Sequence, residues 1–301
     1  MYTNFMEINR LDERYRALLS EVLHNGTEKD DRTGTGTFSR FGASIRHRMY
    51  EGFPILTTKK MPLKTIATEL KWFLKGESHI KYLLDNNCHI WDGDAYKRYC
   101  DVCSFDLDDP IPKDEFLDKV KNDPAYFHHG LLGPIYGTQW RSWGGKKYID
   151  QIADLIRNLK YNPNSRRHLV SAWNVEDLGK MVLPPCHYSF QCYVANNKLS
   201  LMWNQRSADL FLGVPFNISS YGLLLLLLCE ETGYEPGDLI GNFGDIHLYK
   251  NHVEQAKEQV RRSQYKLPKL KVSNVDILKG EFDFELTDYR YHPTIKAPLN
   301  N

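Results

Sequence analysis

Three stretches of the chain repeat apolar residues every three or four positions, which is the spacing of an amphipathic helix. They cover residues 12–25, 62–76 and 149–159. Gly26 and Gly76 stand where the first two patterns stop, as suits the end of a helix. The apolar stripe of the third helix is expected to face inward.

A run of leucines at residues 223–228 predicts a further helix that is buried on all sides. Ser219 or Ser220 is expected to be its N-cap, and Gly233 follows its end. One more helix is predicted over residues 248–262.

Three shorter stretches rich in β-branched and aromatic residues predict strands. They lie at residues 168–173, 188–194 and 198–203. Asn196 and Asn197, between the last two, tolerate positive φ and predict a hairpin. His247 and Tyr249 alternate at strand spacing, which would place both side chains on one face. The elements together predict a single α+β domain over residues 1–301.

Composition and charge narrow the class of protein. The 301 residues include 39 Lys and Arg against 38 Asp and Glu, so no general attraction to nucleic acid or membrane is indicated. The leucine run is shorter than the ~20 residues that cross a bilayer. The N-terminal residues are not expected to form a signal peptide, so the six cysteines are expected as free thiols in the cytoplasm, and no metal site is expected. Residues 93–132, the least regular stretch, are expected to form a surface insertion.

Cys186 is the first candidate for chemistry. It follows Pro184 and Pro185, and a loop after the predicted hairpin could bring Arg206 back beside it. A nearby cation stabilises a thiolate and so activates a cysteine as a nucleophile. The alternative is a buried cysteine near an unrelated surface arginine.

Further arginines suggest a site for a doubly charged anion. Arg32 precedes a loop of glycines and hydroxyls at 33–37 that lacks the ending of a Walker motif. Arg166 and Arg167 are adjacent, so both reach one phosphate only from a loop or across a subunit interface. Together with Arg206 and Ser207 they would form a dianion site.

Two polar residues stand in apolar surroundings. Glu69 lies inside the stripe of the second predicted helix, and Asn217 follows the segment 213–216. The Asn217 amide can both donate and accept, which suits a pyrimidine edge. The alternatives are a glutamate paired with a core arginine and an asparagine that caps the next helix. His247 and Tyr249, on one strand face, suit a sugar hydroxyl.

These segments, taken in order, resemble the thymidylate synthase family from residue 31 to the C-terminus. Each motif alone is weak, but the ordered set is specific. The matching segments are Asp31–Thr37, Pro54–Lys60, Gly133–Gly137, Ser165–Arg167, Pro185–His187, Gln205–Ser207, Phe211–Asn217 and His247–Tyr249.

The resemblance implies a mixed β-sheet packed by helices, with the sheet at a homodimer interface. It implies reductive methylation of deoxyuridylate (dUMP) to thymidylate (dTMP), with methylenetetrahydrofolate as donor and without a metal. The implied catalytic residues are Cys186, Glu69, Tyr136, Arg206 and Asn217. The implied substrate-binding residues are Arg32, Gln205, Arg206, Ser207, Asp209, Asn217, His247 and Tyr249, with Arg166 and Arg167 from the partner subunit. The implied folate-binding residues are Lys59, facing the glutamate tail, Ile90, Trp91, Asp209, Leu212, Gly213, Phe216 and Ala297.

Two departures from the family pattern lie on the folate side. Asp94 stands where the family often has tryptophan, and Tyr96 or Tyr99 is a candidate substitute. The chain ends in Asn300 and Asn301, where small apolar residues are frequent. If these polar residues admit water, the alternative is a deoxyuridylate hydroxymethylase. A second alternative is a binding protein, such as an RNA-binding relative without activity.

Overall fold

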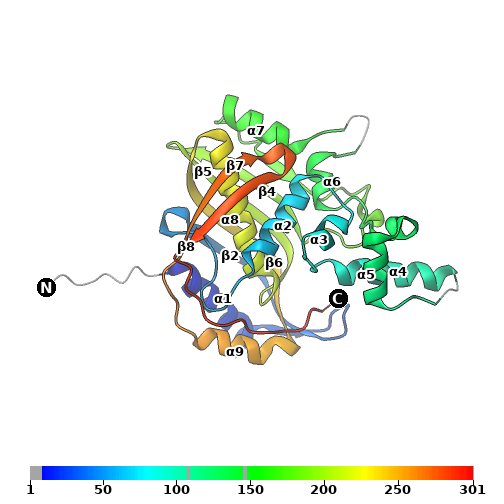
Figure 1. Ribbon diagram of the computed structural model, residues 1–301. Coiled ribbons are helices and arrows are strands. Elements are labelled where there is room, and N and C mark those ends of the chain that lie inside the picture. Colours follow the sequence, from blue (N-terminus) through cyan, green and yellow to red (C-terminus); the bar gives the residue numbers. More distant parts are fainter. Residues whose placement is uncertain (1–8, 107–108, 145–147, 301) are drawn as a thin grey trace.

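The computed structural model describes residues 9–106, 109–144 and 148–300, and there a six-stranded sheet runs in the order β1-β2-β6-β5-β4-β3 (Figure 1). Strands β5 and β6 are parallel, whereas the other neighbours are antiparallel, so the predicted mixed α+β class is confirmed. Strands β7 and β8 form a separate hairpin. The strands are β1 Thr27–Lys29, β2 Thr37–Arg48, β3 Leu169–Ser171, β4 His187–Ala195, β5 Lys198–Asp209, β6 Glu235–Tyr249, β7 Lys269–Asp276 and β8 Glu281–Thr287.

Helices α1, α2 and α7 lie close to the three ranges that the apolar patterns predicted. The α-helices are α1 Arg10–Asn25, α2 Leu63–Leu74, α3 Lys81–Asp85, α4 Asp92–Asp106, α5 Lys113–Asn122, α6 Tyr136–Arg141, α7 Gln151–Tyr161, α8 Gly213–Thr232 and α9 Val253–Arg261. The 3-10 helices are η1 Met49–Glu51, η2 Pro124–Gly130, η3 Leu178–Lys180, η4 Lys250–His252 and η5 Ile277–Lys279. The predicted hairpin is also confirmed, since Asn196 and Asn197 have φ values of 51° and 58°.

Helix α8 connects the parallel strands β5 and β6 and packs against both. It is long and apolar enough to cross a membrane, but 72% of its most apolar window is buried inside the protein, as in a core helix. The predicted N-cap is wrong, because α8 already begins at Gly213. The Asp209 carboxylate accepts the amides of Phe211 and Leu212 just before it, while Ser219 Oγ donates to the Pro54 carbonyl inside the core.

Two other expectations are corrected. The helix predicted from residue 248 begins later, because Leu248 pairs with Phe38 in the sheet and β6 ends at Tyr249. The stretch 93–132 is largely helical, since α4, α5 and η2 lie there. The many charged residues of this stretch hid its helical pattern in the sequence. In the structure it has a small core, in which the rings of Tyr99 and Phe116 stack with their centroids 4.7 Å apart. Its description as a surface insertion stays a prediction.

Asp12 joins α1 to the segment that leads into the site. Its buried carboxylate accepts bonds from the Thr57 amide at 3.0 Å, the Thr57 hydroxyl at 2.6 Å and the Thr58 hydroxyl at 3.1 Å. Asn9 donates to it as well. This network fixes the chain immediately before Lys59.

Asp12→Ala is expected to lower the free energy of unfolding by about 3–5 kcal/mol, because it leaves several buried donors unsatisfied. Urea unfolding followed by circular dichroism measures the loss. The exposed Glu13, on the same helix turn, provides the control Glu13→Ala, which is expected to change stability by less than about 0.5 kcal/mol. A similar small loss for both variants would contradict the role given to Asp12.

Candidate active site

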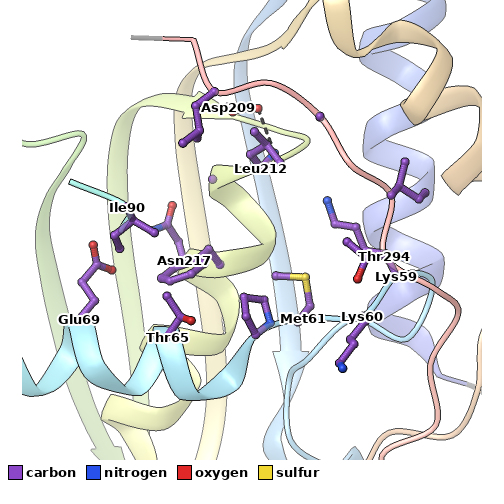
Figure 2. Close-up of a pocket in the computed structure, with 16 residues that line it drawn as sticks. Lys59, Lys60, Met61, Thr65, Glu69, Ile90, Asp209, Leu212, Asn217 and Thr294 are labelled. Atoms are coloured by element: carbon purple, nitrogen blue, oxygen red, sulfur yellow. Dashed lines mark hydrogen bonds between the residues drawn. The ribbon is translucent and has the colours of Figure 1, made fainter. Parts of the chain in front are cut away.

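Two adjoining pockets meet at the first turn of α8. The nucleophile pocket has a volume of about 320 Å³ and contains Cys186. The side pocket has a volume of about 430 Å³ and contains Lys59 and Lys60 (Figure 2). Six residues line both pockets: Glu69, Ile90, Asp209, Gly213, Asn217 and Leu299. Ligands in the two pockets would therefore share the contacts of these six residues.

Cys186 is fixed by its backbone on both sides. Its amide donates to the Tyr136 hydroxyl at 2.8 Å, and its carbonyl accepts the Arg206 amide at 2.8 Å. The Arg206 guanidinium donates to the carbonyls of Pro185 and Pro184, at 3.0 and 2.7 Å. Arg206, on β5, thus lies beside the cysteine as predicted, and the alternative of an unrelated surface arginine is wrong.

The charge state of Cys186 is set by two opposed effects. Burial raises the pKa of the thiol, and this effect outweighs the lowering by Arg206. Arg32 also lowers the pKa, whereas the negative charge of Asp94 raises it. Without a ligand, Cys186 is therefore held as a thiol, and Arg206 eases its deprotonation without completing it.

Two of the residues predicted to bind an anion have unpaired side chains in the nucleophile pocket. Arg32 and Ser207 line it, and neither side chain bonds to another residue that the structure describes. The loop after Arg32 differs from expectation. The Asp31 carboxylate accepts the amides of Thr33 and Gly36 and the Thr33 hydroxyl, so these donors are not free for a phosphate.

Three predicted substrate-binding residues stand apart from this arrangement. Arg166 and Arg167 lie exposed in the loop before β3 and do not line either pocket. Gln205 lines the nucleophile pocket, but its amide is occupied. Its Nε2 donates to the Ser207 carbonyl, and its Oε1 accepts the Trp203 indole. Gln205 therefore holds the part of β5 that presents Ser207.

Glu69 lies buried where the two pockets meet. Its Oε1 accepts the Trp91 indole N–H at 2.9 Å, so its partner is not a core arginine. Burial raises the pKa of this carboxyl to about 7, which suits proton exchange near neutral pH.

Asn217 and the pair on β6 also face the nucleophile pocket. Asn217 lies inside α8 and does not cap a helix, and its amide bonds to none of the other described side chains. The rings of His247 and Tyr249 meet edge to face at 5.3 Å, as their strand spacing predicted. Burial raises the pKa of Tyr249 to about 12, so its phenol can donate a hydrogen bond.

His187 is a site residue that the sequence did not single out. Its ring stacks on Tyr136 at 4.2 Å, and its Nδ1 lies 2.8 Å from the Tyr221 hydroxyl. Burial lowers its pKa to about 3, so the ring is neutral. Its position next to Cys186 at the start of a strand was the available signal.

Lys59, which the resemblance implies would face the glutamate tail, lines the side pocket with its side chain buried. Its ammonium donates to the Phe211 carbonyl and lies 3.8 Å from the centre of the Phe211 ring. Burial lowers its pKa to about 7. Lys60, which also lines the side pocket, is the exposed lysine, because neighbours in an extended segment point in opposite directions. The other predicted folate residues line the side pocket, except Trp91, which lines the nucleophile pocket.

Asp94, which stands where the resembled family often has tryptophan, lines the nucleophile pocket. Burial raises the pKa of its carboxyl against the effect of Arg32. Neither Tyr96 nor Tyr99 lines a pocket beside it, because both rings pack on Phe116. The proposed tyrosine substitute is therefore wrong.

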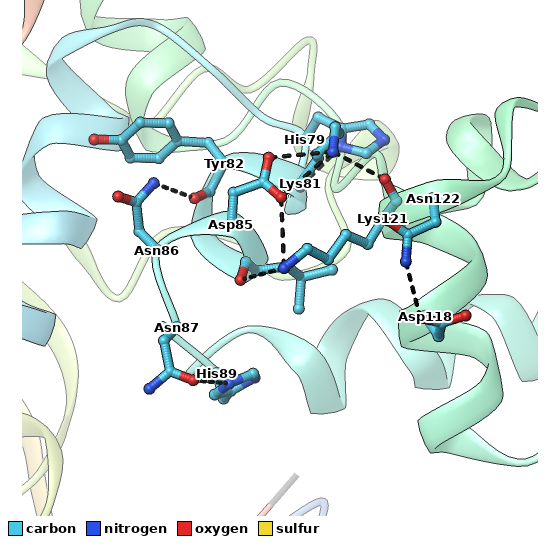
Figure 3. A network of polar contacts seen from close by, with 11 residues as sticks. His79, Lys81, Tyr82, Asp85, Asn86, Asn87, His89, Asp118, Lys121 and Asn122 are labelled. Atoms are coloured by element: carbon cyan, nitrogen blue, oxygen red, sulfur yellow. Dashed lines mark hydrogen bonds and ion pairs between the residues drawn. The ribbon is translucent and has the colours of Figure 1, made fainter.

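A polar network ties the helical stretch after Asp94 to α3 (Figure 3). Asp85 lies 3.1 Å from the Lys81 ammonium and 3.6 Å from that of Lys121 on α5. The Lys81 ammonium also donates to the Lys121 carbonyl at 2.8 Å. These contacts join α3 to α5, and α5 in turn packs against α4, which carries Asp94.

Comparison with known proteins shows the family of the chain. The family model for thymidylate synthase matches residues 13–301. Thymidylate synthase of Mycoplasma mobile is 48% identical over 292 residues, which cover 95% of this chain and 99% of the relative. Thymidylate synthase of Listeria monocytogenes is 48% identical over 314 residues, with 96% and 99% covered. Similarity of this extent shows that the chain belongs to the thymidylate synthase family.

Proposed function

We propose that Cys186, Glu69 and Arg206 carry out the reaction of this family, the reductive methylation of dUMP by methylenetetrahydrofolate. The products are dTMP and dihydrofolate. The observation that carries the proposal is the cysteine held between Tyr136 and Arg206, in a pocket that opens onto a second one. One pocket takes the nucleotide and the other the folate.

The nucleotide is oriented by three sets of groups in the nucleophile pocket. Arg32, Arg206 and Ser207 bind the phosphate, for which charge-assisted hydrogen bonds are the strongest available. His247 and Tyr249 bind the 3′-hydroxyl of deoxyribose. The unpaired amide of Asn217 reads the uracil edge, and Asp209 lies between nucleotide and folate.

Cys186 thiolate adds to C6 of the pyrimidine, which turns C5 into an enolate carbon. This carbon attacks the methylene group of the folate, and a base then removes the C5 proton. Glu69, with a pKa of about 7, and Tyr136 organise these proton transfers with water. Elimination of tetrahydrofolate produces an exocyclic methylene group on C5. Tetrahydrofolate, still bound, then transfers a hydride to this methylene group. The new methyl group forms, Cys186 is expelled, and dihydrofolate is released.

The hydroxymethylase alternative is not supported, because the relatives from Mycoplasma mobile and Listeria monocytogenes are thymidylate synthases. The same finding argues against a binding protein that lacks activity.

A metal plays no part in the proposed steps. All six cysteines are free thiols, which supports a location in the cytoplasm.

Covalent trapping tests the proposal directly. Fluorodeoxyuridylate carries fluorine at C5, where the proton must leave, so the reaction stops at the covalent stage. With methylenetetrahydrofolate present, mass spectrometry is expected to find one nucleotide and one folate on the peptide that contains Cys186. An unmodified Cys186 would contradict the proposed nucleophile.

The same proposal includes a homodimer in which Arg166 and Arg167 reach the partner's phosphate. Their exposed loop outside both pockets supports this arrangement. Apolar side chains exposed on three strands of the large sheet support the sheet as the interface. Phe41 on β2, Leu169 on β3 and Tyr193 on β4 are 91%, 50% and 65% exposed.

Mixing two inactive variants tests the shared site. Arg166→Ala/Arg167→Ala and Cys186→Ser are each expected to be nearly inactive alone. After joint refolding, roughly a quarter of the wild-type activity is expected, since mixed dimers contain one site with every group intact. Refolding each variant with itself is the control. No recovery despite verified mixed dimers would place the arginines in their own subunit's site.

A further inference from the structure

Asn300 brings a polar side chain to the mouth of the nucleophile pocket. It lines that pocket together with Leu299. Water at this place would compete with hydride for the exocyclic methylene. A polar residue here therefore needs an explanation.

The Asn300 amide is occupied by protein groups. Its Oδ1 accepts the Thr35 hydroxyl at 3.1 Å and the Asn251 amide at 2.8 Å, and its Nδ2 donates to Asn251 Oδ1 at 3.4 Å. Nearby, the buried His252 donates Nε2–H to the Pro298 carbonyl at 2.8 Å. That hydrogen is then used, so the approach of Asn300 Nδ2 to the same ring nitrogen at 3.3 Å is only a contact.

The partners of Asn300 belong to segments that also carry the proposed nucleotide contacts. Thr35 is in the loop that begins after Arg32, and Asn251 follows the end of β6, which carries His247 and Tyr249. The amide thus joins three segments that are far apart in the sequence. Its Oδ1, bonded to both Thr35 and Asn251, is the point where they meet.

We propose that Asn300 is a positioning residue that fastens the C-terminal segment to the phosphate loop and to the end of β6. The C-terminal segment then covers the nucleophile pocket only when the loop after Arg32 and the end of β6 are in the positions in which they bind dUMP. Its polar atoms bond to protein and bring no water. This inference rests on the proposed function and adds a residue that controls how well water is excluded.

Asn300→Ala removes both Oδ1 bonds. We expect the KM for methylenetetrahydrofolate to rise about tenfold, with a smaller fall in kcat. We also expect uncoupling: release of the C5 proton, followed with tritium-labelled dUMP, should exceed dihydrofolate formation, and hydroxymethyl product should appear. Asn300→Asp keeps the acceptor for Thr35 and Asn251 and should restore most of the coupling.

Thr35→Val removes the hydroxyl while it keeps the shape of the side chain. Combined with Asn300→Ala, it should add little to the loss that Asn300→Ala causes alone, because that variant has already broken the contact with Thr35. Effects that multiply would overturn the link between tail and loop. Asn300→Ala with unchanged coupling and KM, or with lowered thermal stability alone, would overturn the proposal. Failure of the proposed function itself is distinguishable, because the unmodified protein would then form no dTMP.

Discussion

Cys186→Ser is expected to lower kcat by on the order of 10⁴-fold or more, because it removes the group that bonds to the substrate. A serine hydroxyl is far less acidic than a thiol and a weaker nucleophile at C6. Arg206 lowers the pKa of the group at this position, but burial already outweighs that help for the thiol. The loss is measured as the rate of dihydrofolate formation under saturating substrates.

The matched control for this variant is Cys100→Ser. Cys100 is half-buried on α4 and lines neither pocket, so its replacement is expected to leave kcat within about twofold of wild type. Both variants should unfold at similar temperatures. More than about a tenth of wild-type activity in Cys186→Ser would mean that the thiol is not the nucleophile.

Glu69→Gln is expected to lower kcat by about 10²–10⁴-fold, the usual worth of a positioned acid or base. The amide keeps the acceptor for the Trp91 indole but cannot exchange a proton. Single-turnover measurement of C5 proton release should locate the defect at that step. Normal proton release in this variant would remove Glu69 from the proposed proton path.

The same substitution is expected to stabilise the protein at higher pH. Burial raises the Glu69 pKa from 4.5 to about 7, so the folded state binds the proton more tightly than the unfolded state. This contribution to stability is fully present below pH 4.5 and is lost as the pH rises through 7. Relative to wild type, Glu69→Gln should gain up to roughly 3 kcal/mol between about pH 4.5 and 8. A gain that is larger in acid would contradict the raised pKa.

Local patterns predicted much of the fold, and the reasons are visible in particular elements. Helices α1, α2 and α7 each bury one stripe, so helical spacing marked them. Strand β2 escaped prediction because its middle is mostly exposed and carries polar residues. The start of α8 escaped because several residues of its first turns, among them Gly213 and Asn217, line the pockets, so no helical stripe marks the boundary.

The site was predicted mainly through ordered motifs, and its details depend on contacts that are distant in sequence. The bonds of Asp31 to the amides of Thr33 and Gly36 are an exception, because they span only two and five positions and follow the local turn pattern of aspartate. By contrast, the inward turn of Lys59 depends on the Phe211 carbonyl and ring. The bond of Asn300 to Thr35 joins residues 265 positions apart, and only the folded chain reveals it.

Product analysis tests the central claim most directly. The protein is incubated with dUMP and methylenetetrahydrofolate, the nucleotide is identified by mass spectrometry, and dihydrofolate is followed by absorbance. We expect dTMP and dihydrofolate in equal amounts, which would show that hydride reaches the exocyclic methylene despite Asp94 and Asn300. Hydroxymethyl-deoxyuridylate without dihydrofolate would contradict the account, because water would then have captured that group.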